Sequence, residues 1–239
     1  MPARRTSRLV FAWKAFCYGL GLLVAGFVAV QLWFLGHIVY WKFAEPAATA
    51  FMERRLEELR SRNPRAALRR EWTPYARISL HLKRAVVAAE DAKFLDHEGF
   101  DWEMIHQAMA KNQSKGRVVA GASTISQQLA KNLFLSGQRS WIRKGQEAFI
   151  TWMLEAILSK QRILELYLNY AEWGEGVFGA EAAARYHFNA RAATLDAGQA
   201  AYLAAILPSP RRYGAGRTTP YIEGRAVTIL ARMDGAQIP

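Results

Sequence analysis

The sequence has few cysteines, no internal repeats and no low-complexity tracts. Its 239 residues include a single cysteine, Cys17, which excludes a disulfide framework within the chain. Cysteine usage therefore does not indicate whether the protein resides in an oxidising or a reducing compartment. The lack of repeats excludes a solenoid or an array, and the five histidines show no spacing typical of zinc ligands. With 51% hydrophobic and 22% charged residues, the composition predicts one sizeable packed domain rather than disorder.

Negative charge is also scarce, and it is absent from the first part of the chain. All 20 acidic residues follow residue 41, together with 28 of the 32 basic ones, so this larger part carries a net charge of +8. Such a surplus is consistent with an ordinary solvated surface. It also suits anionic partners, namely phospholipid headgroups, nucleic acid or a substrate that carries a pyrophosphate.

Residues 15–41 contain no Asp, Glu, Lys or Arg. At about 1.5 Å per residue, a helix of this length reaches roughly 40 Å and exceeds the ~30 Å hydrocarbon core of a bilayer. A cleaved signal peptide would have a shorter apolar stretch of about 7–15 residues, and a buried core helix would rarely lack charge for so long. We therefore predict one transmembrane helix over 15–41.

The flanks of this helix indicate its orientation. Aromatic rings that favour the membrane interface lie towards its C-terminal end, at Trp33, Tyr40 and Trp41. A basic cluster precedes it and predicts that residues 1–14 form a cytoplasmic tail: Arg4, Arg5, Arg8 and Lys14.

The rest of the chain divides into a connector and a helical domain. Residues 42–74 form the predicted connector, in which 47–70 has the charge pattern of a helix. The domain, 75–239, has apolar residues at helical spacing almost throughout and is predicted to be mainly α. Its last apolar helix, 196–207, ends before a proline, and 117–120 is the one weak candidate for an extended segment.

The stretch 88–99, Ala-Ala-Glu-Asp-Ala-Lys-Phe-Leu-Asp-His-Glu-Gly, contains the first candidate for chemistry. Glu90 and Asp91 follow four apolar residues, so at least one carboxylate is expected close to a buried face. Burial raises the pKa of a carboxyl group towards values useful for proton transfer. An ordinary acidic pair on a helix surface is the alternative.

A second stretch, 121–132, reads Gly-Ala-Ser-Thr-Ile-Ser-Gln-Gln-Leu-Ala-Lys-Asn. Its Gly and Ser123 predict a turn and an N-cap, where backbone N–H groups open towards an anion. Gln128 stands one turn before Lys131 and Asn132, which places amides and an ammonium on one side. Such a face suits a sugar phosphate, although the polar face of any amphipathic helix has similar residues.

The third stretch, 139–147, brings more cations and a second carboxylate. Arg143 and Lys144 lie four and three residues before Glu147, so the three side chains project to one side of a helix. A surface salt bridge explains that pairing alone. Together with Lys131, however, the set could offset the charge of a pyrophosphate.

Taken in order, the motifs resemble those of the glycosyltransferase family 51 peptidoglycan polymerases. The matching motifs are Glu-Asp-x-x-Phe-x-x-His-x-Gly, Gly-x-Ser-Thr-Ile-x-Gln-Gln-Leu-x-Lys-Asn, Arg-Lys-x-x-Glu and Ile-Leu-Glu-x-Tyr-Leu-Asn. The resemblance covers about residues 75–215, and the segment 171–179 looks like the single-domain members, the monofunctional biosynthetic transglycosylases. No Ser-x-x-Lys or Lys-Thr-Gly is present, so the penicillin-binding domain of the larger relatives is missing.

The resemblance implies a fold and a set of roles. The fold would be a lysozyme-like helical domain with a small lobe facing the membrane. Glu90 would be the general base, and Glu147 the second catalytic glutamate, which would organise the pyrophosphate with a divalent cation, Mg²⁺ or Mn²⁺; no organic cofactor is implied. The residues expected to bind the substrate are Asp91, Ser123, Gln127, Gln128, Lys131, Asn132, Arg139, Arg143 and Lys144.

The same resemblance implies partners and a location. The substrates would be lipid II and the lipid-linked growing glycan strand, which would be joined by β-1,4 bonds with inversion at C1 and release of undecaprenyl pyrophosphate. Membrane lipids and proteins of cell-wall synthesis or division would be partners, and nucleic acid would not. The protein would be a single-pass protein of the inner membrane with its catalytic domain in the periplasm.

Two departures from the family pattern stand out. The family often has Tyr-Phe-Gly where this chain has 186–189, Tyr-His-Phe-Asn. Many members have Lys at the position of Gln146, so this chain lacks one candidate phosphate contact.

Two rival functions remain open from the sequence. A lytic transglycosylase or muramidase, which cuts glycan strands, has a similar lobe and an essential Glu but no use for a pyrophosphate site. A basic, non-catalytic membrane protein would need only the positive charge, although no nucleic-acid-binding module is visible.

Overall fold

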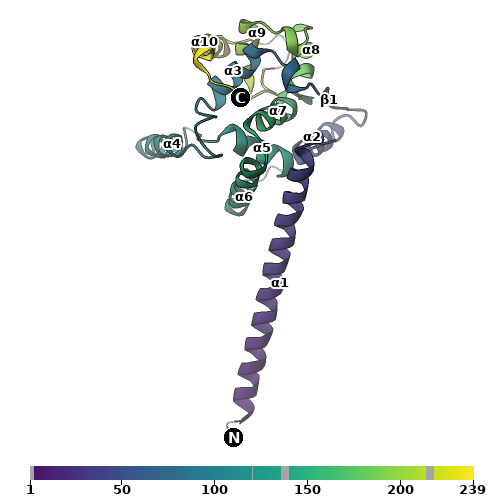
Figure 1. The fold of residues 1–239 in the computed structure, drawn as a ribbon, viewed down its shortest axis with the longest axis vertical. Helices are drawn as coiled ribbons and strands as arrows, with labels where there is room; N and C mark the ends of the chain where they lie inside the picture. The colour runs from purple at the N-terminus through teal and green to yellow at the C-terminus, as the bar shows by residue number, and fades with distance from the viewer. Residues whose placement is uncertain (1–2, 120, 136–139, 214–217) are drawn as a thin grey trace.

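A computed structural model of the chain describes residues 3–119, 121–135, 140–213 and 218–239, with the backbone alone for 3–9. One long helix leads into a helical body (Figure 1). The α-helices of these residues are α1 (Ala3–Trp41), α2 (Ala50–Arg60), α3 (Leu80–Glu90), α4 (Trp102–Lys115), α5 (Ile125–Phe134), α6 (Trp141–Ile157), α7 (Lys160–Tyr170), α8 (Ala180–Phe188), α9 (Ala197–Ile206) and α10 (Pro220–Leu230). Short 3-10 helices η1 (Tyr75–Arg77), η2 (Ala192–Thr194) and η3 (Met233–Gly235) and three short strands complete the described part. The predicted mainly α fold is confirmed; the likeness to lysozyme stays a prediction.

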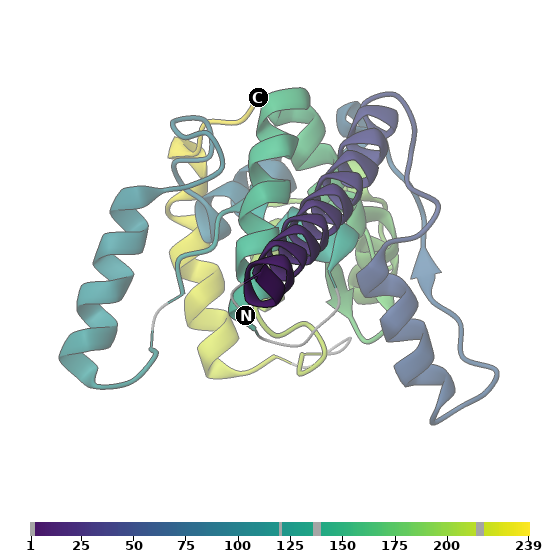
Figure 2. The ribbon, with the colours of Figure 1, turned by 90° about the horizontal axis from the view of Figure 1, so that it is seen from below.

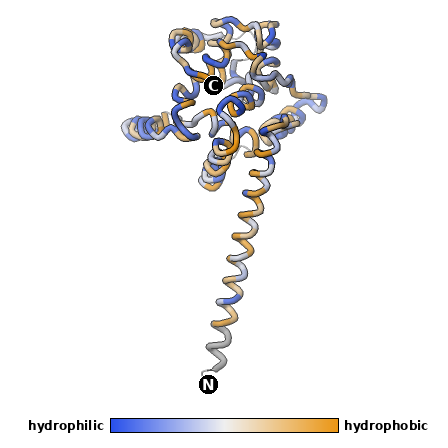
Figure 3. The backbone as a smooth tube through the Cα atoms, in the orientation of Figure 1, coloured by the Kyte–Doolittle hydropathy of each residue, from blue (hydrophilic) through white to orange (hydrophobic). Residues whose placement is uncertain are grey.

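Helix α1 is long and apolar enough to cross a membrane. The suitable segment is Val10–Trp41, with a mean hydropathy of 2.1. In its most apolar stretch of 18 residues, only 11% is buried inside the protein. It extends away from the body as an isolated rod (Figure 1), apolar along much of its length (Figure 3). This helix fits the predicted single-pass anchor.

The last turns of α1 pack against the body rather than standing free. Phe34, Ile38 and Trp41 are buried, and the Trp41 ring stacks on Phe134 of α5 with ring centroids 4.8 Å apart. Trp41 is therefore a packing residue, whereas Trp33 and Tyr40 remain exposed as interface residues would be. The anchor is joined rigidly to the domain that follows it.

The core of the body surrounds α5, α7 and α9. Helix α7 follows the N-cap residue Ser159, and its apolar residues Ile163, Leu164, Tyr167 and Leu168 are buried. Helix α9 begins with a capping box between Asp196 and Gln199 and is apolar on all sides, so it is buried between α3 and α10. These contacts hold the C-terminus of α3 in place.

The connector is less helical than predicted. Helix α2 ends at Arg60, so the expectation of a helix over 47–70 is wrong beyond that point. Strand β1 (Arg69–Arg70) instead pairs in parallel with β3 (Val177–Phe178), which pairs antiparallel with β2 (Glu172–Gly174). Backbone hydrogen bonds to a distant strand outweigh the local helical pattern. Residues 117–119, in contrast, form no strand.

The described part also shows two helices on the side from which α1 leaves. Helix α6 extends from the body beside the upper turns of α1, and α4 lies at the outer edge, away from α1 (Figures 1 and 2). Both expose large apolar side chains: Trp102 and Met109 on α4, and Trp141, Ile142, Phe149 and Trp152 on α6. Exposed apolar patches of this size mark an interaction surface, consistent with the predicted lobe that faces the membrane.

Asn189 accounts for one departure from the family pattern. It is the C-cap of α8 and adopts the left-handed conformation, with φ 52° and ψ 34°. Glycine favours this conformation, and asparagine is among the few other residues that tolerate it. The replacement of Gly by Asn therefore preserves the end of the helix.

Gly179, at the start of α8, is expected to resist substitution. Its φ is +87°, and an added Cβ would lie 2.9 Å from the backbone oxygen of Asn169. Gly179→Ala should cost about 1–3 kcal/mol, which lowers the thermal unfolding midpoint in detergent by several degrees. Gly198→Ala, in the first turn of α9, is the matched control, because its Cβ would meet nothing closer than 3.4 Å. Equal midpoints for the two variants would contradict this account.

Candidate active site

Glu90 is the last residue of α3, and its side chain is only 11% exposed. Its Oε2 accepts a hydrogen bond of 2.9 Å from Nε2 of Gln128 on α5. Its Oε1 is buried and accepts no hydrogen bond from any described residue; the nearest cation is Nη2 of Arg225, on α10, at 3.5 Å. One oxygen is thus fixed while the other keeps free lone pairs.

The surroundings of Glu90 favour proton uptake. Burial raises the pKa of its carboxyl group above the ordinary 4.5, while the bond from Gln128 and the charges of Arg225 and Lys131 counter part of that rise. A buried carboxylate with a raised pKa and a free oxygen is suited to general-base catalysis. The sequence-based interpretation of Glu90 is consistent with this geometry.

Gln128 is held in turn by Tyr167. The Tyr167 hydroxyl donates a 3.0 Å hydrogen bond to Oε1 of Gln128, which leaves the amide nitrogen free to donate to Glu90. Tyr167 is buried, and burial raises the pKa of its phenol well above 10, so it stays a donor. The sequence analysis did not single out Tyr167, because helical spacing does not show what its hydroxyl contacts.

Asp91 lies beneath the site and faces away from the hollows. It is 2% exposed, its Oδ2 accepts from the backbone N–H of Ile125 at 3.0 Å, and its Oδ1 bonds Nε2 of His97 at 2.9 Å. The cap of α5 is Thr124, in a capping box with Gln127, and not Ser123 as predicted. The N-terminus of α5 is therefore occupied by a carboxylate of the protein itself, and it does not open towards a substrate anion.

The cations predicted to offset a pyrophosphate gather around a small hollow of about 200 Å³. Glu147 is buried; its Oε2 pairs with Nη1 of Arg143 at 3.0 Å, and its Oε1 pairs with Nζ of Lys144. The remaining lining residues include Ser123, Gln127, Gln128 and Lys131. Arg139, the other predicted cation, lies outside the described residues.

Lys131 links this hollow to Glu90. Desolvation lowers the pKa of its ammonium from 10.5, and the charges of Arg143 and Lys144 act in the same direction, while the carboxylates Glu147 and Glu90 raise it. Positive charges crowded in this way favour an anionic ligand. Such a ligand would relieve the repulsion among the three cations.

The predicted divalent cation finds no ligand set among the described side chains. Both oxygens of Glu147 already take ion pairs, and the described residues contain no group of three or more His, Cys, Asp or Glu that could hold a metal ion. Hard cations need several oxygen ligands. The divalent cation therefore stays a prediction.

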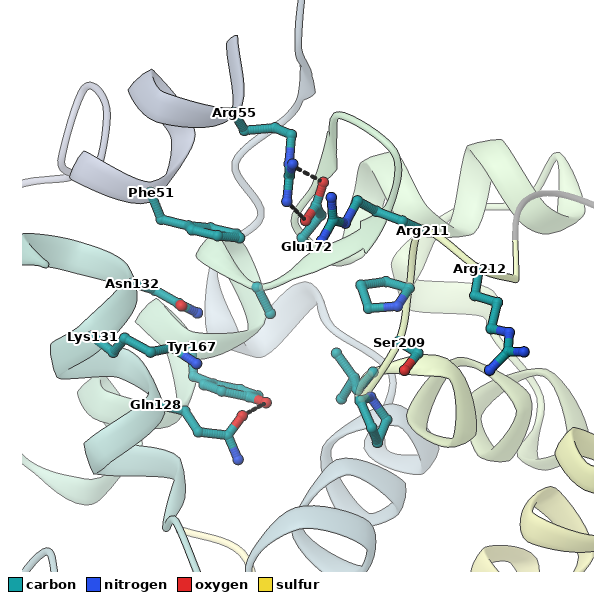
Figure 4. A pocket seen from close by; sticks show the side chains of 14 residues that line it. Phe51, Arg55, Gln128, Lys131, Asn132, Tyr167, Glu172, Ser209, Arg211 and Arg212 are labelled. Carbon is teal, nitrogen blue, oxygen red and sulfur yellow. Dashed lines mark hydrogen bonds and ion pairs between the residues drawn. The ribbon is translucent and has the colours of Figure 1, made fainter. Parts of the chain in front are cut away.

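A larger hollow of about 560 Å³ opens on the other side of Gln128. Gln128, Lys131 and Asn132 line one wall from α5, and the segment that contains Ser209, Arg211 and Arg212 lines the opposite wall (Figure 4). At one end Arg55 forms a buried bidentate pair with Glu172, with N–O distances of 2.9 and 3.1 Å. The hollow is rich in cations and lies beside Glu90.

The sequence analysis did not identify several residues of this site: Arg55, Tyr167, Arg211, Arg212 and Arg225. Of these, only Arg211 and Arg212 gave a signal that could have been used, because they are an adjacent basic pair within the segment 75–215 that resembles the family. The others come from α2, α7 and α10, and they reach the site only through tertiary packing.

Comparison with known proteins agrees with this arrangement. The family model described as Transglycosylase matches residues 55–234. The chain belongs to this family. The match begins at Arg55 and ends beyond α10, so it includes all the lining residues of the two hollows except Phe51.

Relatives in the transglycosylase family match nearly the whole chain. A protein of Dechloromonas aromatica is 57% identical over 217 residues, which cover 91% of this chain and 94% of that one. One from Nitrosospira multiformis is 54% identical over 95% of this chain and 97% of its own, and one from Laribacter hongkongensis is 56% identical over 92% and 97%. All three are named biosynthetic peptidoglycan transglycosylase.

Asp91 is expected to act on stability rather than on substrate contact. Asp91→Asn removes the charge at the N-terminus of α5 and weakens the bond to His97, which should cost about 1–2 kcal/mol. The thermal unfolding midpoint should fall by a few degrees. Asp96→Asn, at an exposed position in the same loop, should leave it unchanged. An unchanged midpoint for Asp91→Asn would restore the predicted role in substrate binding.

Proposed function

We propose that this transglycosylase family member is a peptidoglycan glycosyltransferase that polymerises lipid II into β-1,4 glycan strands and releases undecaprenyl pyrophosphate. One observation carries the proposal: a buried carboxylate with a free oxygen, Glu90, lies beside a cluster of cations that share one buried glutamate, Glu147. A base and an anion site next to each other are what transfer from a diphosphate-activated sugar requires. The names of the relatives support the same activity.

The proposed reaction needs one proton transfer and one substitution. The carboxylate of Glu90 takes the proton of the acceptor's 4-hydroxyl, and the hydroxyl oxygen bonds to C1 of the donor sugar. The bond between C1 and the pyrophosphate oxygen breaks on the opposite face, so C1 is inverted and the electron pair leaves with the diphosphate. Lys131, Arg143 and Lys144 offset the charge that develops there.

Glu147 supports this step indirectly. Its two oxygens hold Arg143 and Lys144, which lie one turn earlier on α6, with both side chains on the same side of the helix. Preorganised cations need no rearrangement when charge develops on the leaving group. The larger hollow, with Arg55, Arg211 and Arg212 in its lining, is proposed to bind the saccharide chain and its carboxylates.

The anchor suits a substrate with a polyprenyl tail. Each CH₂ group taken out of the bilayer would cost about 0.8 kcal/mol, so such a substrate stays in the membrane. We propose that α1 spans the inner membrane with a cytoplasmic N-terminus and that the body works at the periplasmic surface. The basic residues before the span support this orientation. Proteins of cell-wall synthesis or division stay predicted partners.

A lytic enzyme is the rival, and its products would differ. Attack by water or by a sugar hydroxyl on a glycan strand involves no diphosphate and gives the cation cluster no role. Mass analysis of the products separates the two activities: longer lipid-linked strands indicate a polymerase, whereas short or anhydro-ended fragments indicate a lytic enzyme.

Glu90→Gln is expected to abolish polymerisation without unfolding the protein. The amide cannot accept the acceptor's proton, and loss of a general base typically costs about 10²–10⁴-fold in rate. The assay incubates detergent-solubilised protein with labelled lipid II and measures polymer. Glu98→Gln, exposed in the following loop, serves as the control. Polymer formation near the wild-type rate by Glu90→Gln would refute the role of Glu90.

Arg225 is expected to set the acid limb of the pH profile. Glu90 must be deprotonated to act, so kcat/KM should fall as the pH drops through its raised pKa. The charge of Arg225 lowers that pKa, and Arg225→Met should therefore move the acid limb to higher pH. Arg62→Met, whose side chain is 73% exposed, is the control. If the acid limb of Arg225→Met stays in place or moves to lower pH, Arg225 does not lower the pKa of Glu90.

A further inference from the structure

Gln31 is the one amide side chain in the charge-free segment 15–41. It lies on the part of α1 next to α6, where it forms a reciprocal pair with Gln146: each Nε2 donates to the other residue's Oε1, both at 3.0 Å. The sequence separation is 115 residues. Each amide therefore satisfies one donor and one acceptor of the other.

The environment of this pair is apolar. Phe27, one turn earlier on α1, packs edge-on against Phe149 of α6 with ring centroids 5.8 Å apart. Gln31 lies ten residues, about 15 Å, before the end of α1. In an apolar environment an unpaired amide is costly, so a matched pair of amides selects one register between two helices.

The pair also bears on the active site. Gln146 directly precedes Glu147, so one turn of α6 presents an amide to α1 and a carboxylate to the cation site. A rotation or a slide of α6 along α1 would break the amide pair and displace Glu147 together with Arg143. The contact with the anchor and the cation site thus lie on two sides of α6.

We infer that the Gln31–Gln146 bridge is a positioning device: it fixes α6 against the anchor and so sets the place of the Arg143, Lys144 and Glu147 group relative to the lipid-borne pyrophosphate. This inference rests on the proposed function, because it assigns the cations to that pyrophosphate. Gln31 and Gln146 are positioning residues and touch no substrate. The anchor thereby becomes part of the substrate-binding machinery.

The kinetic test compares Gln31→Leu, Gln146→Leu and the double variant with wild type in liposomes that contain labelled lipid II. Each single variant leaves one amide unpaired and should raise KM about three- to tenfold, as expected for an interhelical hydrogen bond of roughly 0.6–1.4 kcal/mol. The kcat should change less, because the cations hold the pyrophosphate in the bound state as well as in the transition state. The double variant should be no worse than the more affected single variant.

Leu32→Ala is the matched control, because Leu32 neighbours Gln31 and is 60% exposed on α1. Its KM should equal that of wild type. Unchanged KM in both Gln variants would overturn the inference. A parallel loss of kcat and thermal stability, without the rise in KM, would overturn it too, because that pattern describes a purely structural bridge.

A second measurement needs no activity. In a Cys17→Ser background, Gln31→Cys and Gln146→Cys together should be joined within one chain by a short bifunctional thiol reagent, whereas Leu32→Cys with Gln146→Cys should not. Cross-linking is also expected to restore the KM raised by the two substitutions. Absence of the cross-link refutes the bridge. If the cysteine pair cross-links but the wild-type protein makes no polymer from lipid II, the proposed function is refuted instead.

Discussion

The hydrogen bond from Gln128 to Glu90 is the interaction on which the site depends. It joins the end of α3 to α5 and fixes one oxygen of the carboxylate, while the other oxygen accepts no hydrogen bond from a described residue. Burial raises the pKa of this carboxyl group, and Arg225 keeps the charged form accessible. A base of this kind needs both effects, because too much desolvation would leave it protonated and too little would leave it a weak base.

The scaffold around this bond consists largely of buried polar contacts. Asp91 ties the turn after α3 to the first N–H of α5 and to His97, while Tyr167 orients Gln128 from α7. The contacts of Asp91 with α5 and of Tyr167 with Gln128 join residues 34 and 39 positions apart in the sequence. A fully paired buried network is rigid, which is what a base that must act without rearrangement requires. The apolar packing of α9 against α3 supports the same region.

Helix α6 connects the side of the body from which α1 leaves with the candidate active site. Its exposed apolar residues lie on the side from which α1 leaves, and its charged residues line the smaller hollow. One helix thus carries both an exposed apolar surface and the cations of the smaller hollow. Gln146, where many family members have Lys, faces α1 and not the hollow, so the loss of a cation at that position does not weaken the cluster around Glu147.

The sequence by itself determined the helical class and the family, and it predicted the anchor and the roles of Glu90, Glu147 and their neighbouring cations. These features are local: a charge-free run, helical periodicity and short motifs, each visible within a few turns. Only the tertiary structure decided that Asp91 is a support, that Thr124 caps α5, and that residues 61–70 do not continue a helix. It alone brought Arg55, Tyr167 and Arg225 to the site and paired Gln31 with Gln146. These contacts join residues far apart in the chain, and helical spacing says which face a side chain occupies but not what packs against that face.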